Sequence, residues 1–250
     1  MLRLRERRAT QAQVVERPGE DSPCKAIPTY QEFPPNDRQL MAATTRAQAT
    51  PPEERALRRR GAARVVGVDI SGEMVSVARA HEAERPLGID YIVQDVASLG
   101  DLDRFDLAVA VHLLGYARSR EELVQMGTGI ARSVKPGGRF VTYFVSPDVS
   151  RAPGHCRKYG VDCFAHEGVK DGDVFYFSLI LGDTTTPKLT NHYWTRATVA
   201  SAFGEAGLTS IRWITPALSP QGVEQHGEDF WQDYLRHLPD ILMEFKKPDA

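Results

Sequence analysis

The stretch RVVGVDIS, residues 64–71, decides the fold. Its apolar residues surround Gly67 and end at Asp69, a pattern that predicts a buried parallel strand with a carboxylate at its C-terminal end. In doubly wound folds such a carboxylate accepts hydrogen bonds from both hydroxyls of a ribose. A glycine-rich turn about 20 residues earlier lets the rest of the nucleoside approach the backbone closely. Here no glycine occurs between Gly19 and Gly61. The ribose ligand is therefore predicted without its usual companion turn.

The composition sets limits on the class of protein. A chain of 250 residues accommodates one large α/β domain, alone or with an appendage. The net charge of −2 argues against binding of nucleic-acid backbones as the main task. No apolar run reaches the roughly 18–20 residues that span a bilayer. The three cysteines, Cys24, Cys156 and Cys163, are scattered. We therefore expect a cytoplasmic protein without nucleic-acid or membrane partners; its oligomeric state stays open.

Residues 1–50 differ from the rest of the chain. They are rich in arginine and hold few, scattered apolar residues, so we expect a poorly ordered N-terminal segment. Glu6 and Glu16 argue against a mitochondrial presequence. We expect the ordered domain to span 51–250, with 147–194 as an insertion on the acceptor side.

Strand and helix patterns alternate after residue 50. A helix follows Thr50 and ends at Gly61, and Ser71 and Ser119 cap two further helices. Such alternation predicts a parallel sheet with right-handed crossovers. The expected strands are 64–69, 88–94, 105–111 and 139–145, with a turn at 135–138. Beyond them we expect an irregular segment at 147–171, a hairpin of 173–182 and 188–194, helices at 195–206 and 228–238, and strands at 210–214 and 241–245.

Several motifs in this order resemble class I S-adenosylmethionine-dependent methyltransferases, over about residues 55–247. They are VVGVDIS (65–71), QDV (94–96), FDLAVAV (105–111), KPGGRF (135–140), NHYWT (191–195), AGL (206–208), IRW (211–213) and FW (230–231). The chain looks most like small natural-product methyltransferases such as the one of toxoflavin biosynthesis. The resemblance implies a Rossmann-like, doubly wound α/β fold with a mostly parallel sheet, an antiparallel C-terminal strand and a small β-hairpin insertion. It also implies S-adenosyl-L-methionine as cofactor and a small-molecule acceptor of secondary metabolism.

The resemblance also implies roles for six residues. One carboxylate would hold the ribose, the next would accept from the adenine amine, and the residues after the central strand would flank the transferred methyl group. The cofactor-binding residues would be Asp69, Ile70, Asp95, Val96, His112 and Leu113. His112 is also the candidate general base, although a lone histidine after an apolar strand is more often a pocket wall or a satisfied core residue. Asp69 and Asp95 have structural alternatives as a helix N-terminal acid and a turn acid.

Aromatic residues in the variable part are candidates for acceptor binding. His192, Tyr193, Trp194 and Trp231 are expected to form a cluster that stacks on a planar acceptor, with ordinary packing as the alternative. Tyr116 and Tyr143 are further candidates for the acceptor pocket, with core packing as the stronger alternative. We expect no metal site, because the spacing of His155, Cys156, Cys163 and His166 fits no standard zinc pattern.

The family's first strand and its glycine-rich loop have no visible counterpart. Residues 40–49, LMAATTRAQA, stand in their place with neither glycine nor acid. Every residue there carries a Cβ, which would crowd the backbone approach to the amino-acid half of the cofactor. We take a shifted reading frame, an alternative exon or true degeneration as the possible origins, which upstream genomic sequence would separate.

Three functions remain open from the sequence. The leading one is methyl transfer from S-adenosylmethionine. A pseudo-enzyme or partner subunit would keep the fold without holding the cofactor. An NAD-dependent oxidoreductase also uses a strand ending in aspartate, but dinucleotide binding depends still more on the missing turn.

Overall fold

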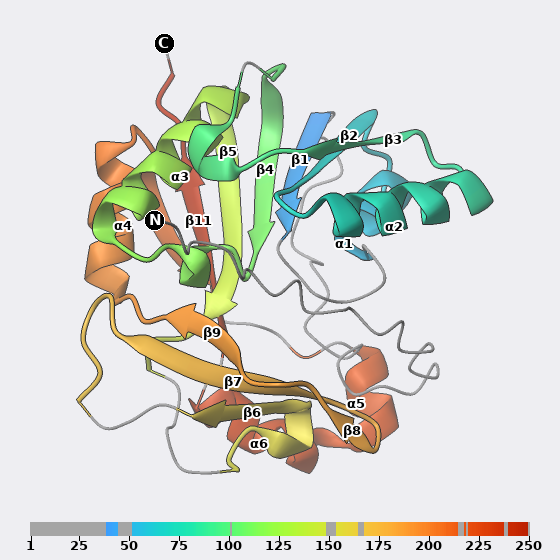
Figure 1. Ribbon diagram of the computed structural model, residues 1–250, viewed down its shortest axis with the longest axis vertical. Coiled ribbons are helices and arrows are strands. Elements are labelled where there is room, and N and C mark those ends of the chain that lie inside the picture. The colour runs from blue at the N-terminus through green and yellow to red at the C-terminus, as the bar shows by residue number, and fades with distance from the viewer. Residues whose placement is uncertain are drawn as a thin grey trace, which may run out of the picture.

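The fold is built around a central sheet (Figure 1). The computed structural model describes residues 39–44, 52–100, 102–148, 154–164, 168–214, 218, 220–237 and 240–249. Within these residues a seven-stranded sheet has the order β10-β11-β5-β4-β1-β2-β3. Its strands are β1 (Gln39–Thr44), β2 (Arg64–Asp69), β3 (Ile89–Val93), β4 (Phe105–Val111), β5 (Val134–Val145), β10 (Thr209–Ile214) and β11 (Asp240–Lys246). Strands β1–β5 are parallel, whereas β11 is antiparallel to both β5 and β10. The predicted Rossmann-like sheet is confirmed.

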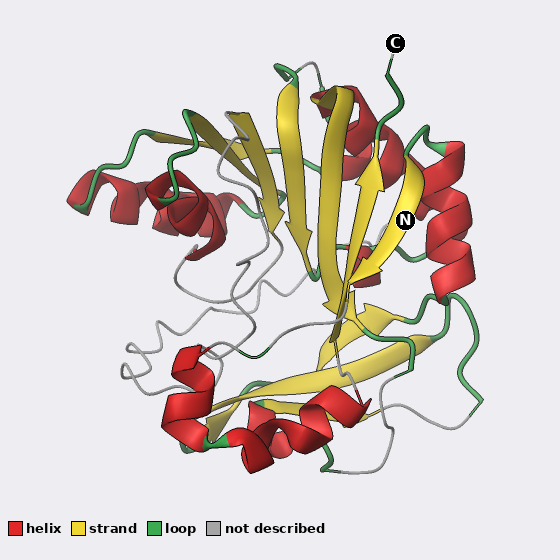
Figure 2. Cartoon of the chain, turned by 180° about the vertical axis from the view of Figure 1, so that it is seen from behind, coloured by secondary structure: helices red, strands yellow, loops and turns green. Residues whose placement is uncertain are grey.

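Helices cover both faces of this sheet (Figures 1 and 2). They are α1 (Pro52–Arg59), α2 (Gly72–Glu84), α3 (Arg120–Ser133) and α4 (Arg196–Glu205). Because side chains alternate along a strand, neighbouring residues enter different cores. Leu107 packs with Leu57 of α1 and Val75 of α2, whereas Ala108 belongs to the core of Ile130 and Phe203 from α3 and α4. The fold is therefore doubly wound, as the sequence predicts.

A smaller antiparallel sheet lies beyond the carboxyl ends of β4 and β5 (Figure 1). It contains β6 (Val161–Phe164), β7 (Val174–Leu181), β8 (Thr184–Thr185) and β9 (Leu189–His192), and α5 (Pro220–His226) and α6 (Glu228–His237) lie beside it. Strands β7 and β9 are the predicted hairpin. The expectation that 147–171 is irregular is wrong for β6. This strand is too short to show alternation, and β7 supplies its hydrogen bonds.

The first strand of the sheet exists despite its unusual sequence. Backbone pairing joins β1 to β2 on one side and to β4 on the other, with Leu40 opposite both Val65 and Leu107. The expectation that residues 40–49 hold no trace of this strand is thus wrong for its part within β1. Two parallel neighbours supply partners to both edges of the backbone, and this context outweighs a weak intrinsic strand preference. The rest of the predicted N-terminal segment, 1–38 and 45–50, lies outside the described residues.

The predicted turn at 135–138 lies inside β5. Val134 pairs with Phe105 and Arg139 with Leu107, so residues 135–138 bulge outward opposite Asp106. Gly137 has a φ of 71°, which permits the sharp bend. Expecting the strand to begin only at Arg139 is therefore wrong, because strand pairing begins at Val134, before the bend, and continues from Arg139 after it.

The carboxylate of Glu82 fastens the end of α2 to the start of β3. It accepts from the N–H groups of Gly88 (2.7 Å) and Ile89 (3.3 Å) and from Arg55 (2.7 Å). Burial opposes its ionisation, but the backbone N–H groups and Arg55 outweigh burial and lower the pKa of Glu82. The ionised carboxylate is therefore stabilised in the folded state.

We expect the substitution Glu82→Gln to lower the free energy of unfolding at pH 7 by about 1–2 kcal/mol. The pKa of Glu82 is lower in the folded than in the unfolded chain, so the difference from wild type should shrink as pH falls below about 4.5. Urea titrations at several pH values measure this. Glu84→Gln, at the exposed end of the same helix, is the control. A pH-independent difference would contradict the assignment.

Candidate functional site

Asp69 lies at the carboxyl end of β2, as predicted. Its Oδ1 accepts the N–H of Ser71 at 2.7 Å, and Ser71 caps α2 by accepting from the N–H of Met74 at 3.2 Å. Burial raises the pKa of Asp69, and the bond from Ser71 opposes that rise. The neighbouring Ile70 is 61% exposed. A carboxylate and an exposed apolar side chain thus stand together at the sheet edge.

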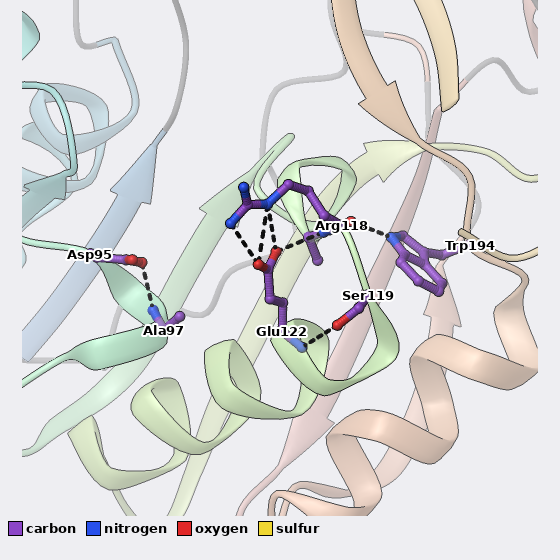
Figure 3. A network of polar contacts seen from close by, with 7 residues as sticks. Asp95, Ala97, Arg118, Ser119, Glu122 and Trp194 are labelled. Carbon is purple, nitrogen blue, oxygen red and sulfur yellow. Dashed lines mark hydrogen bonds and ion pairs between the residues drawn. The ribbon is translucent and has the colours of Figure 1, made fainter. Parts of the chain in front are cut away.

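Asp95 follows the next strand. The N–H of Gln94 donates to the carbonyl of Asp69 at 3.0 Å, which ties the ends of β2 and β3 together. Asp95 caps the short 3-10 helix Val96–Ser98, and its Oδ1 accepts from Ala97 at 2.9 Å (Figure 3). Val96 is buried in the main core. The hydrogen bond from Ala97 agrees with the interpretation of Asp95 as a turn acid. This bond uses Oδ1 and leaves Oδ2 of Asp95 for a further contact.

The residues after β4 have distinct surroundings. His112 has a φ of 54°, and its N–H donates to the carbonyl of Tyr143 at 2.7 Å. Leu113 is buried in the main core. Tyr116, in the 3-10 helix Leu114–Tyr116, is 40% exposed. Of the candidates after this strand, Tyr116 offers the largest exposed aromatic surface.

The predicted aromatic cluster is divided. Trp194 lies in the main core and donates to the carbonyl of Ala117 at 3.2 Å (Figure 3). Trp231 lies in a separate cluster with Tyr159 and Tyr234. Grouping Trp231 with His192, Tyr193 and Trp194 is therefore wrong, because α6 packs its rings against the 3-10 helix Arg157–Tyr159.

Near Trp194, Tyr193 donates its hydroxyl to the carbonyl of Pro147 at 3.2 Å. His192, half-buried at the end of β9, has an Nδ1 without a hydrogen-bond partner. Tyr193 and Trp194 thus contact different parts of the chain, at Pro147 and at Ala117.

Tyr234 and Asp240, which the sequence did not single out, contact the hydroxyl of the candidate residue Tyr143. Tyr143 is buried, and its hydroxyl contacts Tyr234 at 2.9 Å and donates to Asp240 at 3.0 Å. Burial raises the pKa of Tyr143 far above its usual value, and the charge of Asp240 adds to the rise. Tyr143 therefore lies inside the protein rather than on an acceptor surface. Only the antiparallel register of β5 and β11 brings Asp240 near it.

Arg118 and Glu122 form a surface pair between the Asp95 loop and β9 (Figure 3). The guanidinium of Arg118 donates to Glu122 at 2.8 Å, and the backbone N–H of Arg118 donates to the same carboxylate at 2.7 Å. Ser119 caps α3 as predicted, with a bond of 3.3 Å from the N–H of Glu122. The pair stabilises the start of α3 beside the candidate site.

Among the described residues no group of three or more histidine, cysteine or acidic side chains is arranged to hold a metal ion. His155, Cys156 and Cys163 belong to that part of the chain, and His166 lies outside it. Over the same part, no helix combines the length and apolar character that crossing a bilayer requires.

The edge formed by β2 and β3 fits a nucleoside. Carboxylates at the ends of two adjacent strands can accept from a ribose and from an exocyclic amine, and Ile70 offers an exposed apolar face. The segment at the end of β1 that would meet the other half of a cofactor, 45–51, lies outside the described residues. The fit therefore concerns the nucleoside half.

Sequence comparisons match the part of the chain that holds β2, β3 and β4. A family model described as "Methyltransferase domain" matches residues 53–138. A ubiquinone biosynthesis O-methyltransferase of Coxiella burnetii is 34% identical over 76 residues. That match covers 30% of this chain and 31% of the relative's own length.

Structural comparisons extend the likeness to most of the chain. An S-adenosylmethionine-dependent methyltransferase of Mesorhizobium loti has a TM-score of 0.57 at 20% identity, covering 86% of this chain and 94% of its own. A second such methyltransferase, described as putative, from Listeria monocytogenes has a TM-score of 0.59 at 16% identity. This match covers 87% of this chain and 93% of its own. The [4+2]-cyclase SpnF also matches, with a TM-score of 0.52 at 17% identity over 86% and 76%. Residues 53–138 thus match a methyltransferase-domain family model, and the chain has the same Rossmann-like fold as these S-adenosylmethionine-dependent methyltransferases.

Proposed function

We propose that the protein transfers a methyl group from S-adenosylmethionine to a small molecule. The observation that carries this proposal is the pair Asp69 and Asp95 at the ends of adjacent parallel strands, inside the segment that matches the methyltransferase domain. SpnF, a [4+2]-cyclase by name, has a similar fold, and one fold can host more than one reaction. The proposal therefore rests on the residues of the candidate site and not on the fold.

The cofactor-binding residues act on separate parts of the nucleoside. Asp69 accepts the two ribose hydroxyls, and Asp95 accepts from the adenine amine. Ile70 covers one side of the nucleoside, and Val96 supports the adenine ring from the core. A bound S-adenosylmethionine supplies an already activated methyl group, so the protein's main task is to align the acceptor and exclude water.

The acceptor side comprises the end of β4 and the small sheet beyond it. Leu113 supports the position of the methyl group, and His112 takes the proton that an attacking hydroxyl or protonated amine releases. Tyr116, Tyr193 and His192 bound the acceptor, whereas Tyr143, Trp194 and Trp231 act from buried positions behind them. Segment 147–194 forms this side of the domain. A role in secondary metabolism and a cytoplasmic location belong to the same proposal.

Binding of S-adenosylmethionine is expected to be weak, with a dissociation constant above 1 μM. The reason is the sequence after β1, TRAQATP (residues 45–51), in which every residue has a Cβ where close backbone approach is needed. Isothermal titration calorimetry with S-adenosylmethionine and NADH measures both affinities. Tighter binding than 1 μM would contradict this reason, and binding of NADH alone would favour an oxidoreductase. Binding of neither compound would favour a pseudo-enzyme.

Methyl transfer itself is tested by following S-adenosylhomocysteine formation with a panel of small acceptors. Catechol and other simple phenols come first, because the curated relative is an O-methyltransferase by name. Turnover with any acceptor would support the proposal if it falls in Asp69→Asn at limiting S-adenosylmethionine. Binding of the cofactor without turnover across hydroxyl, amine and carbon acceptors would count against it.

A further inference from the structure

His112 has an uncommon backbone conformation at the end of β4. A φ of 54° lies in the left-handed region, which residues other than glycine occupy only when their surroundings hold them there. Two contacts with Tyr143 supply such a hold. The N–H of His112 donates to the carbonyl of Tyr143 at 2.7 Å, and the two rings meet edge to face with centroids 5.3 Å apart. The orientation of His112 thus depends on Tyr143.

Tyr143 is itself fixed at its far end. Its hydroxyl has one proton, which it donates to Asp240 Oδ2 at 3.0 Å. The hydroxyls of Tyr143 and Tyr234 are also within hydrogen-bond distance of each other, at 2.9 Å. Tyr234 also lies 3.4 Å from the same carboxylate oxygen of Asp240. The buried ring of Tyr143 is consequently held by hydrogen bonds at one end and by its strand at the other.

The network joins segments far apart in the sequence. Tyr143 belongs to β5, Tyr234 to α6 and Asp240 to the start of β11. Leu242 pairs with Tyr143, and Asp240 lies two residues before Leu242 on β11. Because side chains alternate along a strand, Asp240 and Tyr143 project to the same face of the sheet. Figure 1 shows α6 beneath the carboxyl ends of β4 and β5. The C-terminal part of the chain thereby reaches the residue that follows β4.

We propose that Asp240 and Tyr234 are positioning residues, which act through Tyr143 to orient His112 toward the acceptor. This inference rests on the proposed function, in which His112 stands beside the transferred methyl group. Burial and the charge of Asp240 raise the pKa of both tyrosines, so the phenols act as hydrogen-bond donors and not as bases. The role of the network is therefore orientation of His112.

The test is the imidazole resonance of His112 in proton–carbon NMR spectra, assigned with His112→Gln. Tyr143→Phe removes the hydroxyl but keeps the ring and the carbonyl, and Asp240→Asn alters the same network from its other end. We expect both variants to shift the His112 resonance. Tyr159→Phe is the matched control: it also loses a buried tyrosine hydroxyl, which donates to the carbonyl of Phe230 at 3.0 Å, in the cluster around α6. It should leave His112 unchanged.

The outcomes separate this inference from the proposed function. An unmoved His112 resonance in both network variants would overturn the inference, as would an equal shift in Tyr159→Phe. If Tyr143→Phe does not fold, Asp240→Asn and Tyr234→Phe give the same readout. The spectra need no cofactor, so failure of wild type to bind S-adenosylmethionine would refute only the proposed function. With catechol as probe acceptor, we expect kcat of Tyr143→Phe to fall at least tenfold, with KM for S-adenosylmethionine unchanged.

Discussion

The substitution Asp69→Asn should weaken binding of S-adenosylmethionine by about 10- to 100-fold. Asparagine keeps an oxygen for the N–H of Ser71, but it loses the charge and one of the two acceptor oxygens. A hydrogen bond to a charged group contributes about 1.5–3 kcal/mol, and each 1.4 kcal/mol is about tenfold in affinity. Isothermal titration calorimetry of both proteins measures the change.

The same substitution should leave the unliganded protein equally or more stable. Burial raises the pKa of Asp69, so its ionised form is disfavoured by folding above that pKa, and the penalty disappears as pH falls through it. Asparagine carries no such penalty. Asp90→Asn is the charge-matched control, because Asp90 is exposed on β3, in a 3.9 Å ion pair with Arg64. Unchanged cofactor affinity in Asp69→Asn, or weaker binding caused by a fall in Tm, would contradict the assigned role.

The substitution Gly129→Ala should destabilise the protein by about 1–2 kcal/mol and weaken cofactor binding as well. A Cβ at Gly129, in α3, would overlap the carbonyl oxygen of Val96 and stand 3.2 Å from Cβ of Leu99. Overpacking of this kind costs about 1–3 kcal/mol, which exceeds the gain of roughly 0.5–1 kcal/mol from replacing a helical glycine. The displaced backbone belongs to the 3-10 helix that Asp95 caps. Stability and nucleoside binding are therefore coupled at this contact.

Gly204→Ala provides the opposite sign. Gly204 lies in α4, and a Cβ there would meet nothing within 4 Å. The helix preference of alanine then acts alone, and the protein should gain about 0.5–1 kcal/mol. Thermal and urea unfolding of the two variants compare them directly. Equal effects in the two variants would show that the contact of α3 with the Asp95 loop has no special tightness.

Much of the fold was predictable because its signals are local. The caps at Ser71 and Ser119 lie where the sequence places them, each accepting from the N–H three residues later. The strand 105–111 was predicted with its observed bounds, because a nearly continuous apolar run is typical of a central parallel strand. The turn at 135–138 was recognised from its glycines, but its place inside β5 depends on pairing with β4.

The candidate site was predictable in part. Asp69 and Asp95 follow strands, and strand ends of a parallel sheet meet at one edge, so the sequence alone brings them together. Asp240 and Tyr234 were missed because their contacts with Tyr143 span 97 and 91 residues, and no local pattern records such a distance. Trp231 was misplaced for the same reason.

The sequence by itself determined most of the elements after residue 50, the parallel strands β2 to β5 and the acid at the end of β2. Periodicity and capping act within a few residues and need no partner. Only the tertiary structure decided that residues 39–44 form β1. Their backbone pairs with β2 and β4, and this pairing, rather than the intrinsic strand preference of the residues, makes them a strand. The tertiary structure also decided which aromatic rings share a core and which residues fix His112. Such contacts depend on how the layers pack, a property of the whole chain.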